Sequence, residues 1–280
     1  MASVAVDKSI ANLKLSQAVG QRIIYAYDGW TPPRLLREMI GRGEVGGIII
    51  FKRNVKSDSH LAATLKQLQA IPRPAGLKAP LLIMVDQEGG RVKRLAGPPG
   101  QSPGRIGRIA SAAFTNEDLK INRLNIQLVK LTKTDLFPFK RAPARSMVIT
   151  STGIYPALDK QPALFSKRIV MGELRQKLGF AGISITDDLE VPALQSFGST
   201  TTRGKRAIEA GNDLLLFCVS LREGQKALLG LTALYRNKRL DSKELFRTTA
   251  RILAFRQSLQ NDGARKAASN AGNTGKFSSR

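Results

Sequence analysis

Short apolar runs alternate along the chain with segments in which apolar residues recur at helical spacing. Apolar runs bounded by turn residues predict buried strands, and spacings of three and four predict amphipathic helices. The predicted strands cover residues 23–27, 47–51, 81–86, 146–150, 182–187 and 213–219. Helical patterns fall between them, the clearest over residues 166–178, 204–210, 224–235 and 242–259. This alternation is typical of repeated βα units around a parallel sheet.

The fold class predicted from this pattern is α/β, a TIM-type (β/α) barrel. About six βα units are recognisable where a closed barrel has eight, so we expect the barrel to be incomplete. The alternative, a doubly wound nucleotide-binding sheet, needs a glycine-rich phosphate turn, and neither GxGxxG nor GxxxxGK[ST] occurs. We expect one barrel domain over residues 1–260, with an irregular stretch at 97–134. Gly, Ala, Ser, Asn and Lys dominate from residue 261, which predicts a disordered tail over 261–280.

Composition excludes several classes of protein. Hydrophobic residues make up 42% of the 280 residues, enough for a sizeable core. No apolar run approaches the roughly 20 residues that span a bilayer, and the N-terminus lacks the apolar block of a secretory signal. We therefore expect a cytoplasmic protein without a membrane span. One cysteine, Cys218, excludes an internal disulfide, and one histidine, His60, argues against a zinc site. We expect neither a metal nor a cofactor.

The charge of the chain is strongly positive. Forty-five basic residues against 21 acidic ones give a formal net charge of +24. Such an excess predicts weak, nonspecific attraction to polyanions that fades with salt. The basic residues are dispersed without a block of five or six, and aromatic residues do not alternate with them. This pattern argues against a dedicated nucleic-acid surface.

Candidate chemistry lies at the ends of predicted strands, where parallel α/β folds carry their working residues. Asp86 ends one strand and is followed by a glycine-containing loop with Arg94; Asp187 and Asp188 end another. Carboxylates and guanidinium groups bind vicinal hydroxyls, and a carboxylate can attack or stabilise an oxocarbenium-like centre. These residues therefore suit a sugar. The alternative for an acid after a strand is the N-cap of the next helix, above all for Asp188.

The loop VDQEGGRVKRL (Val85–Leu95) closely resembles the signature loop of family 3 glycoside hydrolases, specifically the β-N-acetylhexosaminidase (NagZ-like) branch. Other blocks resemble the same family in the same order. They are VGQ (Val19–Gln21), GEVGGIIIFKRN (Gly43–Asn54), DLFPF (Asp135–Phe139), YPALD (Tyr155–Asp159), LRQKLGFAGISITDDLEVPAL (Leu174–Leu194) and AIEAGNDLLLF (Ala207–Phe217). The resemblance covers roughly residues 15–259. It implies a carbohydrate substrate with terminal β-linked N-acetylglucosamine, such as a cell-wall fragment.

The resemblance also implies roles for matching residues. The first Asp of the family's TDDL motif is the nucleophile, which falls on Asp187. It would attack the anomeric carbon and form a covalent glycosyl-enzyme, which water then releases with retained configuration. The loop residues that hold the sugar in the family fall on Asp86 and Arg94.

One departure from the family bears on activity. Between the signature loop and the DLFPF block, the family carries two further βα units with a KHFPGHG-like segment and a His-Asp dyad that acts as general acid/base. Nothing in residues 97–134 matches them. We therefore expect reduced hydrolysis. The alternative is a catalytically inactive relative that binds a sugar or a polyanion. Asp187, Asp86 and Arg94 favour the enzyme, whereas the missing dyad and the +24 charge favour the binding protein.

Overall fold

Six parallel strands form the main sheet of the computed structural model, which describes residues 8–89, 92–95 and 146–274. The order across the sheet is β3-β2-β1-β8-β7-β6, and every neighbouring pair is parallel. The strands are β1 (Ile23–Tyr25), β2 (Gly47–Ile50), β3 (Leu82–Val85), β6 (Met147–Thr150), β7 (Ile183–Asp188) and β8 (Leu214–Phe217). All six strand predictions are confirmed.

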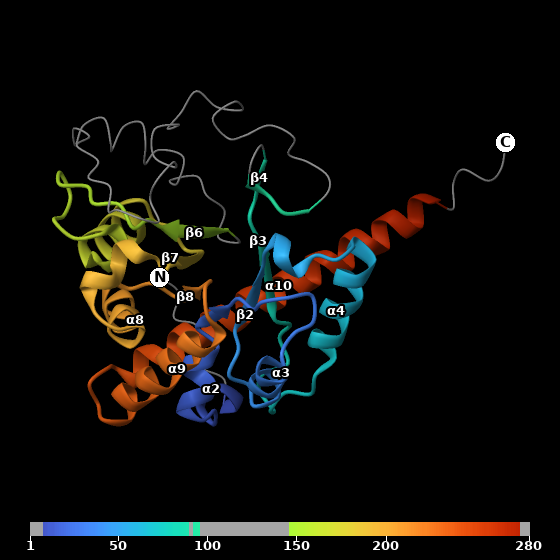
Figure 1. Ribbon diagram of the computed structural model, residues 1–280, viewed down its shortest axis with the longest axis horizontal. Helices are drawn as coiled ribbons and strands as arrows, with labels where there is room; N and C mark the ends of the chain where they lie inside the picture. Colours follow the sequence, from blue (N-terminus) through green and yellow to red (C-terminus); the bar gives the residue numbers. More distant parts are fainter. Residues whose placement is uncertain (1–7, 90–91, 96–145, 275–280) are drawn as a thin grey trace.

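The sheet is curled as an incomplete barrel, which confirms the expected fold class. β1 pairs with both β2 and β8, so the first and last strands of the barrel lie side by side. The sheet ends at β3 and β6 (Figure 1). The irregular stretch predicted at 97–134 lies outside the described residues. In the part of the chain that the structure describes, no helix is long and apolar enough to cross a membrane.

Helices cover the outer face of the sheet. Figure 1 shows α3 and α4 beside β2 and β3, and α8 and α9 on the side of β8 and β7. Among the described residues, the α-helices before the last one are α1 (Lys8–Ala11), α2 (Leu15–Gly20), α3 (Arg34–Gly41), α4 (Asp58–Ala70), α8 (Thr200–Ala210) and α9 (Leu221–Arg236). Short 3-10 helices are η1 (Lys52–Asn54), η3 (Ala163–Phe165) and η5 (Pro192–Phe197), and η4 (Arg168–Lys177) is a π-helix.

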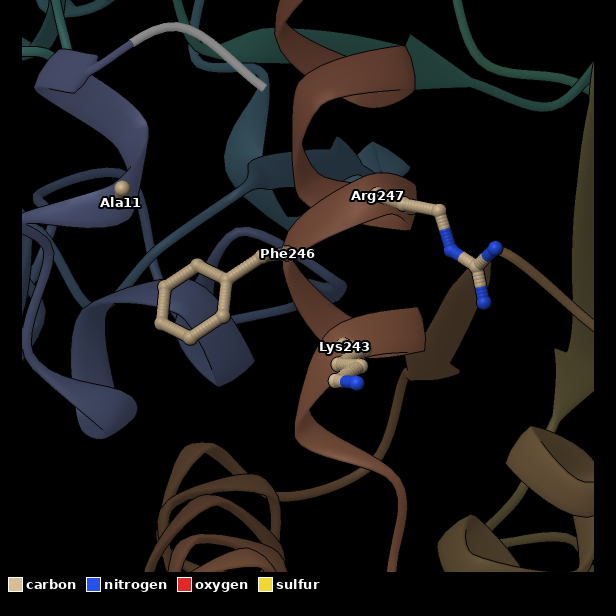
Figure 2. A pocket seen from close by; sticks show the side chains of 4 residues that line it. All are labelled: Ala11, Lys243, Phe246 and Arg247. Atoms are coloured by element: carbon tan, nitrogen blue, oxygen red, sulfur yellow. The ribbon is translucent and has the colours of Figure 1, made fainter. Parts of the chain in front are cut away.

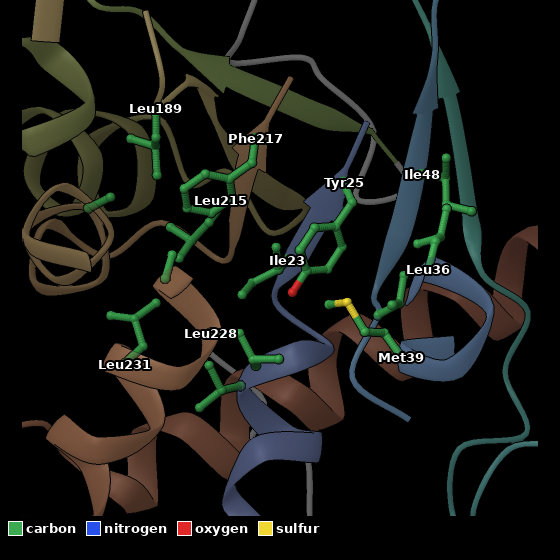
Figure 3. Packing of buried hydrophobic residues seen from close by; sticks show 14 of the residues in the cluster. Ile23, Tyr25, Leu36, Met39, Ile48, Leu189, Leu215, Phe217, Leu228 and Leu231 are labelled. Atoms are coloured by element: carbon green, nitrogen blue, oxygen red, sulfur yellow. The ribbon is translucent and has the colours of Figure 1, made fainter. Parts of the chain in front are cut away.

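Alternate strand residues build two hydrophobic layers, because successive side chains of a strand point to opposite faces. The outer layer joins strand residues to the covering helices (Figure 3). In this layer, Tyr25 of β1 and Met39 of α3 are both fully buried. The labelled members are Ile23, Tyr25, Leu36, Met39, Ile48, Leu189, Leu215, Phe217, Leu228 and Leu231.

The inner layer contains residues of the last helix, α10 (Ser242–Thr274). Ile252 and Phe255 of α10 pack against Ile24, Ile185 and Leu216 on the inner face of the sheet. Arg256, also buried, donates from Nη2 to the Ala79 carbonyl (2.8 Å), just ahead of β3. The helix thus fills the amino-terminal end of the barrel interior.

The structure differs from the sequence prediction at the end of α10. The prediction ended this helix at residue 259, whereas α10 continues to Thr274. The disordered tail over residues 261–280 stays a prediction. Residues 264–268 read ARKAA, and Ala, Arg and Lys are among the strongest helix formers. Local propensity thus favours continuation of the helix past residue 259. Residues 275–280 lie outside the described part of the chain.

A buried ionic network holds the amino-terminal ends of the strands. Asp213, which precedes β8, accepts hydrogen bonds from Arg175, Arg251 and the Ser184 amide. Its carboxylate is fully buried, and the Ser184 bond is 2.8 Å long. In barrels of this type the amino-terminal face contributes stability and the opposite face carries the chemistry. A catalytic site is therefore expected at the carboxyl ends of the strands.

Candidate active site

The loop after β3 folds back so that Arg94 meets Asp86. Gln87 holds it: its Oε1 accepts hydrogen bonds from the Arg94 and Leu95 amides (3.0 and 3.1 Å). The loop forms a small antiparallel hairpin, β4 (Gln87–Gly89) with β5 (Val92–Lys93). Arg94 Nη2 lies 3.6 Å from Asp86 Oδ2. The structure therefore brings these two predicted sugar-binding residues together.

An aromatic ring next to this pair supports two guanidinium groups. Phe51, directly after β2, packs against the inner layer. The Arg94 guanidinium lies 5.8 Å from the centre of its ring, and that of Arg53 lies 4.5 Å away. Arg94 Nε is buried and has no hydrogen-bond partner.

Arg53 ties neighbouring strand ends together. Its Nη2 donates to the Cys218 carbonyl (2.8 Å), and its Nε pairs with Asp28 Oδ1 at 2.8 Å. Asn54 donates to the Tyr27 carbonyl at 2.8 Å. The ends of β1, β2 and β8 are thus fixed to one another at this face of the barrel.

Asp187 lies at the carboxyl end of β7, where the pairing with β8 changes register. Ile185 pairs with Leu214 and Asp188 with Leu216, so three steps on β7 match two on β8. Bulges of this kind re-aim side chains and occur often beside active sites. Asp187 is half-buried, and its Oδ1 accepts a hydrogen bond from the Asp188 amide at 2.8 Å. The predicted nucleophile thus lies on an irregular strand end.

Asp188 is buried, and its side chain accepts hydrogen bonds from backbone amides of the turn after β7 and of the segment after β8. Its Oδ1 accepts from the amides of Glu190 (3.0 Å) and Cys218 (3.1 Å). The next described helix, η5, begins at Pro192 with Val191 as its N-cap, so the N-cap interpretation of Asp188 is wrong. Burial raises the pKa of Asp188 to about 7, which the two amide bonds partly oppose. Near neutral pH this carboxyl group is therefore partly uncharged.

Three carboxylates at the strand ends influence the thiol of Cys218. Burial raises the pKa of Cys218, and the negative charges of Asp188, Asp86 and Asp187 raise it further. Because β3 and β7 belong to one parallel sheet, their carboxyl ends lie at the same edge. Asp86 and Asp187 thus belong to one mouth of the barrel, as predicted. Cys218 itself, with its raised pKa, is a poor nucleophile.

A separate hollow of about 390 Å³ lies between α1 and α10. Its lining residues are Ala11, Lys243, Phe246 and Arg247 (Figure 2). Arg247 is paired with Glu244 at 2.8 Å. The hollow contains none of the carboxylates of the barrel mouth, so we do not assign the sugar site to it. Among the described residues, no group of three His, Cys, Asp or Glu side chains is arranged to hold a metal.

A comparison of the sequence with models of known protein families identifies the family of this chain. The model of the glycosyl hydrolase family 3 N-terminal domain matches residues 5–119 and 112–255. The chain belongs to glycosyl hydrolase family 3. The resemblance read from the sequence is confirmed, and the expected enzyme class, a hydrolase of O-glycosyl bonds, agrees with this membership.

Two curated relatives show how much of this chain's sequence is shared with other proteins. An uncharacterised secreted glycosyl hydrolase of Arthroderma benhamiae is 29% identical, over 91% of this chain and 97% of its own length. That alignment runs over 343 positions, more than the 280 residues of this chain, so the relative carries residues that this chain lacks. A β-hexosaminidase of Nitrosomonas eutropha is 27% identical, over 62% of this chain and 74% of its own length.

Solved structures of similar proteins share the fold. A β-N-acetylglucosaminidase from Paenibacillus sp. superposes with a TM-score of 0.75 at 25% identity, covering 88% of this chain. This chain spans 62% of the length of that protein. A β-N-acetylhexosaminidase from Beutenbergia cavernae gives a TM-score of 0.74 at 22% identity, covering 88% of this chain and 99% of its own.

Sequence reasoning missed two parts of the site. The sequence analysis places Phe51 only at the end of a predicted strand. Its position two residues before Arg53 was the available signal for a contact between the ring and the guanidinium. The sequence analysis does not single out Glu190. In the structure it accepts hydrogen bonds from the amides of Val219 (2.8 Å) and Ser220 (3.0 Å). The spacing of acids in TDDLE was the available signal.

Proposed function

We propose that this chain is a retaining glycosidase that removes terminal β-linked N-acetylglucosamine from cell-wall fragments or related glycosides, with reduced activity. The position of Asp187 carries the proposal. It ends a buried strand at the same mouth as the Asp86–Arg94 pair, in the motif that holds the nucleophile in the family. Relatives named β-hexosaminidase support the choice of sugar.

In the proposed reaction, ionised Asp187 attacks the anomeric carbon of the sugar. A bond forms from its carboxylate oxygen to that carbon, while the bond to the leaving oxygen breaks and its electrons leave with that oxygen. Water then attacks the same carbon and releases Asp187. Asp86 and Arg94 hold the sugar hydroxyls, and their pairing at the barrel mouth supports this role.

We attribute the reduced activity to the lack of a group that protonates the leaving oxygen. Residues 97–134 contain nothing like the family's acid/base dyad. Glu190 does not replace it, because both of its carboxylate oxygens accept hydrogen bonds from backbone amides. A positioned general acid is typically worth about 10²–10⁴-fold in rate. Substrates whose leaving groups depart without protonation should therefore suffer least.

The test compares hydrolysis of 2,4-dinitrophenyl and methyl β-N-acetylglucosaminides by the wild-type chain and by Asp187→Asn. We expect the wild type to cleave the dinitrophenyl compound and to fail with the methyl one. Asp187→Asn should lose nearly all turnover with an unchanged circular dichroism spectrum. Unchanged turnover in the variant would exclude Asp187 as the nucleophile. Competent cleavage of both compounds would show that a proton donor exists.

A second candidate function is a catalytically inactive protein that binds a sugar or a polyanion. The missing dyad and the +24 charge favour it. Its signature would be calorimetric binding of N-acetylglucosamine to the wild-type chain without turnover of either glycoside. Loss of that binding in Arg94→Ala would assign it to the barrel mouth.

A further inference from the structure

The bulge beside Asp187 leaves backbone amides of the β8 end without partners in the regular ladder. Side chains of β7 and the following turn supply oxygens for them at every second residue. Thr186 Oγ1 accepts from the Leu216 amide at 3.1 Å, and Asp188 Oδ1 accepts from the Cys218 amide at 3.1 Å. A buried amide without a partner costs free energy, so these bonds hold the two strand ends in register.

Glu190 completes this side-chain ladder. Its Oε2 accepts from the Val219 amide at 2.8 Å, and its Oε1 accepts from the Ser220 amide at 3.0 Å. Ser220 is also the N-cap of α9, since its hydroxyl accepts from the Glu223 amide at 3.3 Å. Glu190 therefore fixes the turn after Asp187 to the start of α9.

A buried arginine of α8 balances these carboxylates. Arg203 is only 7% exposed, and its Nε and Nη1 have no hydrogen-bond partner. Burial lowers the pKa of Arg203, and the negative charges of Glu190, Asp188 and Glu223 partly oppose this shift. A buried guanidinium with free donors is costly unless negative charge lies nearby. These negative charges offset part of the cost of burying the guanidinium.

We propose that Asp188 and Glu190 are positioning residues that clamp the strand end carrying Asp187 onto β8. The proposal rests on the proposed function, because it concerns the geometry of the nucleophile. Asp187 Oδ1 is held by the amide of Asp188, the residue whose side chain binds the Cys218 amide. Loosening the clamp therefore shifts the attacking oxygen. A displacement of about 1 Å can cost on the order of 10²-fold in rate.

The test replaces Glu190 by Ala, which removes both acceptor oxygens, and by Gln, which keeps one. In Glu190→Ala we expect kcat for the dinitrophenyl glycoside to fall about 10²-fold with KM within a few-fold of the wild type. Glu190→Gln should recover part of the loss. Glu209→Ala, which removes an exposed glutamate of α8, should behave as the wild type.

Amide hydrogen exchange, resolved by residue, separates positioning from general loss of stability. Glu190→Ala should speed exchange at Asp188, Val219 and Ser220 at least 10-fold more than at the core strand β1. Ile252→Ala, which weakens the core, should speed exchange broadly and leave kcat unchanged at temperatures where it is folded. Wild-type kcat in Glu190→Ala, or unchanged exchange at Asp188, would overturn the proposal.

The same exchange experiment distinguishes this proposal from the proposed function. If the wild-type chain hydrolyses neither glycoside, the proposed function fails. The clamp is then tested by the exchange rate of the Asp188 amide hydrogen alone. This amide donates to the Asp187 carboxylate, so its exchange rate reports whether that contact is kept. Selective loss of its protection in Glu190→Ala supports the clamp, and unchanged protection overturns it.

Discussion

Asp188 is a residue whose charge state changes near neutral pH. Its pKa of about 7 in the folded chain lies above the value of about 3.9 expected when unfolded, because burial disfavours the charged carboxylate. Between these values the folded state binds more protons than the unfolded state. This group therefore favours folding at low pH, and its contribution falls as pH rises from about 4 to 7.

The variant Asp188→Asn tests this linkage, since Asn keeps the Oδ1 acceptor and does not titrate. We expect the stability of the variant to rise relative to the wild type as pH increases from 4 to 7, by at most about 1.4 kcal/mol per pH unit. Above pH 7 the difference should level off. Urea unfolding of both proteins across this range measures it. Stability curves that stay parallel throughout would contradict the raised pKa.

At the scale of elements, the strands were predictable and two other features were not. Each strand is a compact apolar run between turn residues, so its position could be read from the sequence. The register change between β7 and β8 could not, because the letters TDDLE do not show which oxygens meet the amides of β8. The inner position of α10 was also hidden, since its apolar spacing fits either face of the sheet.

The inner position of α10 predicts a large cost for one substitution. Ile252 is fully buried among inner-face residues of the strands, so Ile252→Ala should lower the free energy of unfolding by about 3 kcal/mol. Leu259→Ala, further along the same helix and 41% exposed, is the matched control and should cost less than about 1 kcal/mol. Denaturant unfolding compares them. Equal effects would place α10 away from the barrel interior.

For the molecule as a whole, the charge of +24 predicts binding without sequence preference. The basic residues are spread along the chain, so phosphate groups should be attracted without a built site. We expect weak binding of unrelated DNA fragments at low salt, measured by fluorescence anisotropy, with affinity lost at several hundred millimolar salt. Tight binding that survives such salt and separates one sequence from another would contradict this view.

The barrel as a whole brings three distant segments of chain to one mouth. The residue after β2 is Phe51, the loop after β3 contributes Asp86 and Arg94, and β7 contributes Asp187. The strand-end rule and the family resemblance were enough to select the last three from the sequence. The ring of Phe51 and the clamp behind Asp187 needed coordinates, because both depend on contacts between separate strands.

Covalent trapping tests the central claim most directly. A fluorinated N-acetylglucosaminyl donor with a good leaving group slows release of the glycosyl-enzyme, so the intermediate accumulates for mass spectrometry. Digestion and peptide sequencing then locate the added sugar. We predict a single sugar on the Asp187 side chain and none in Asp187→Asn. A chain that turns over the activated glycoside yet carries the sugar on another residue, or carries none, would contradict the account.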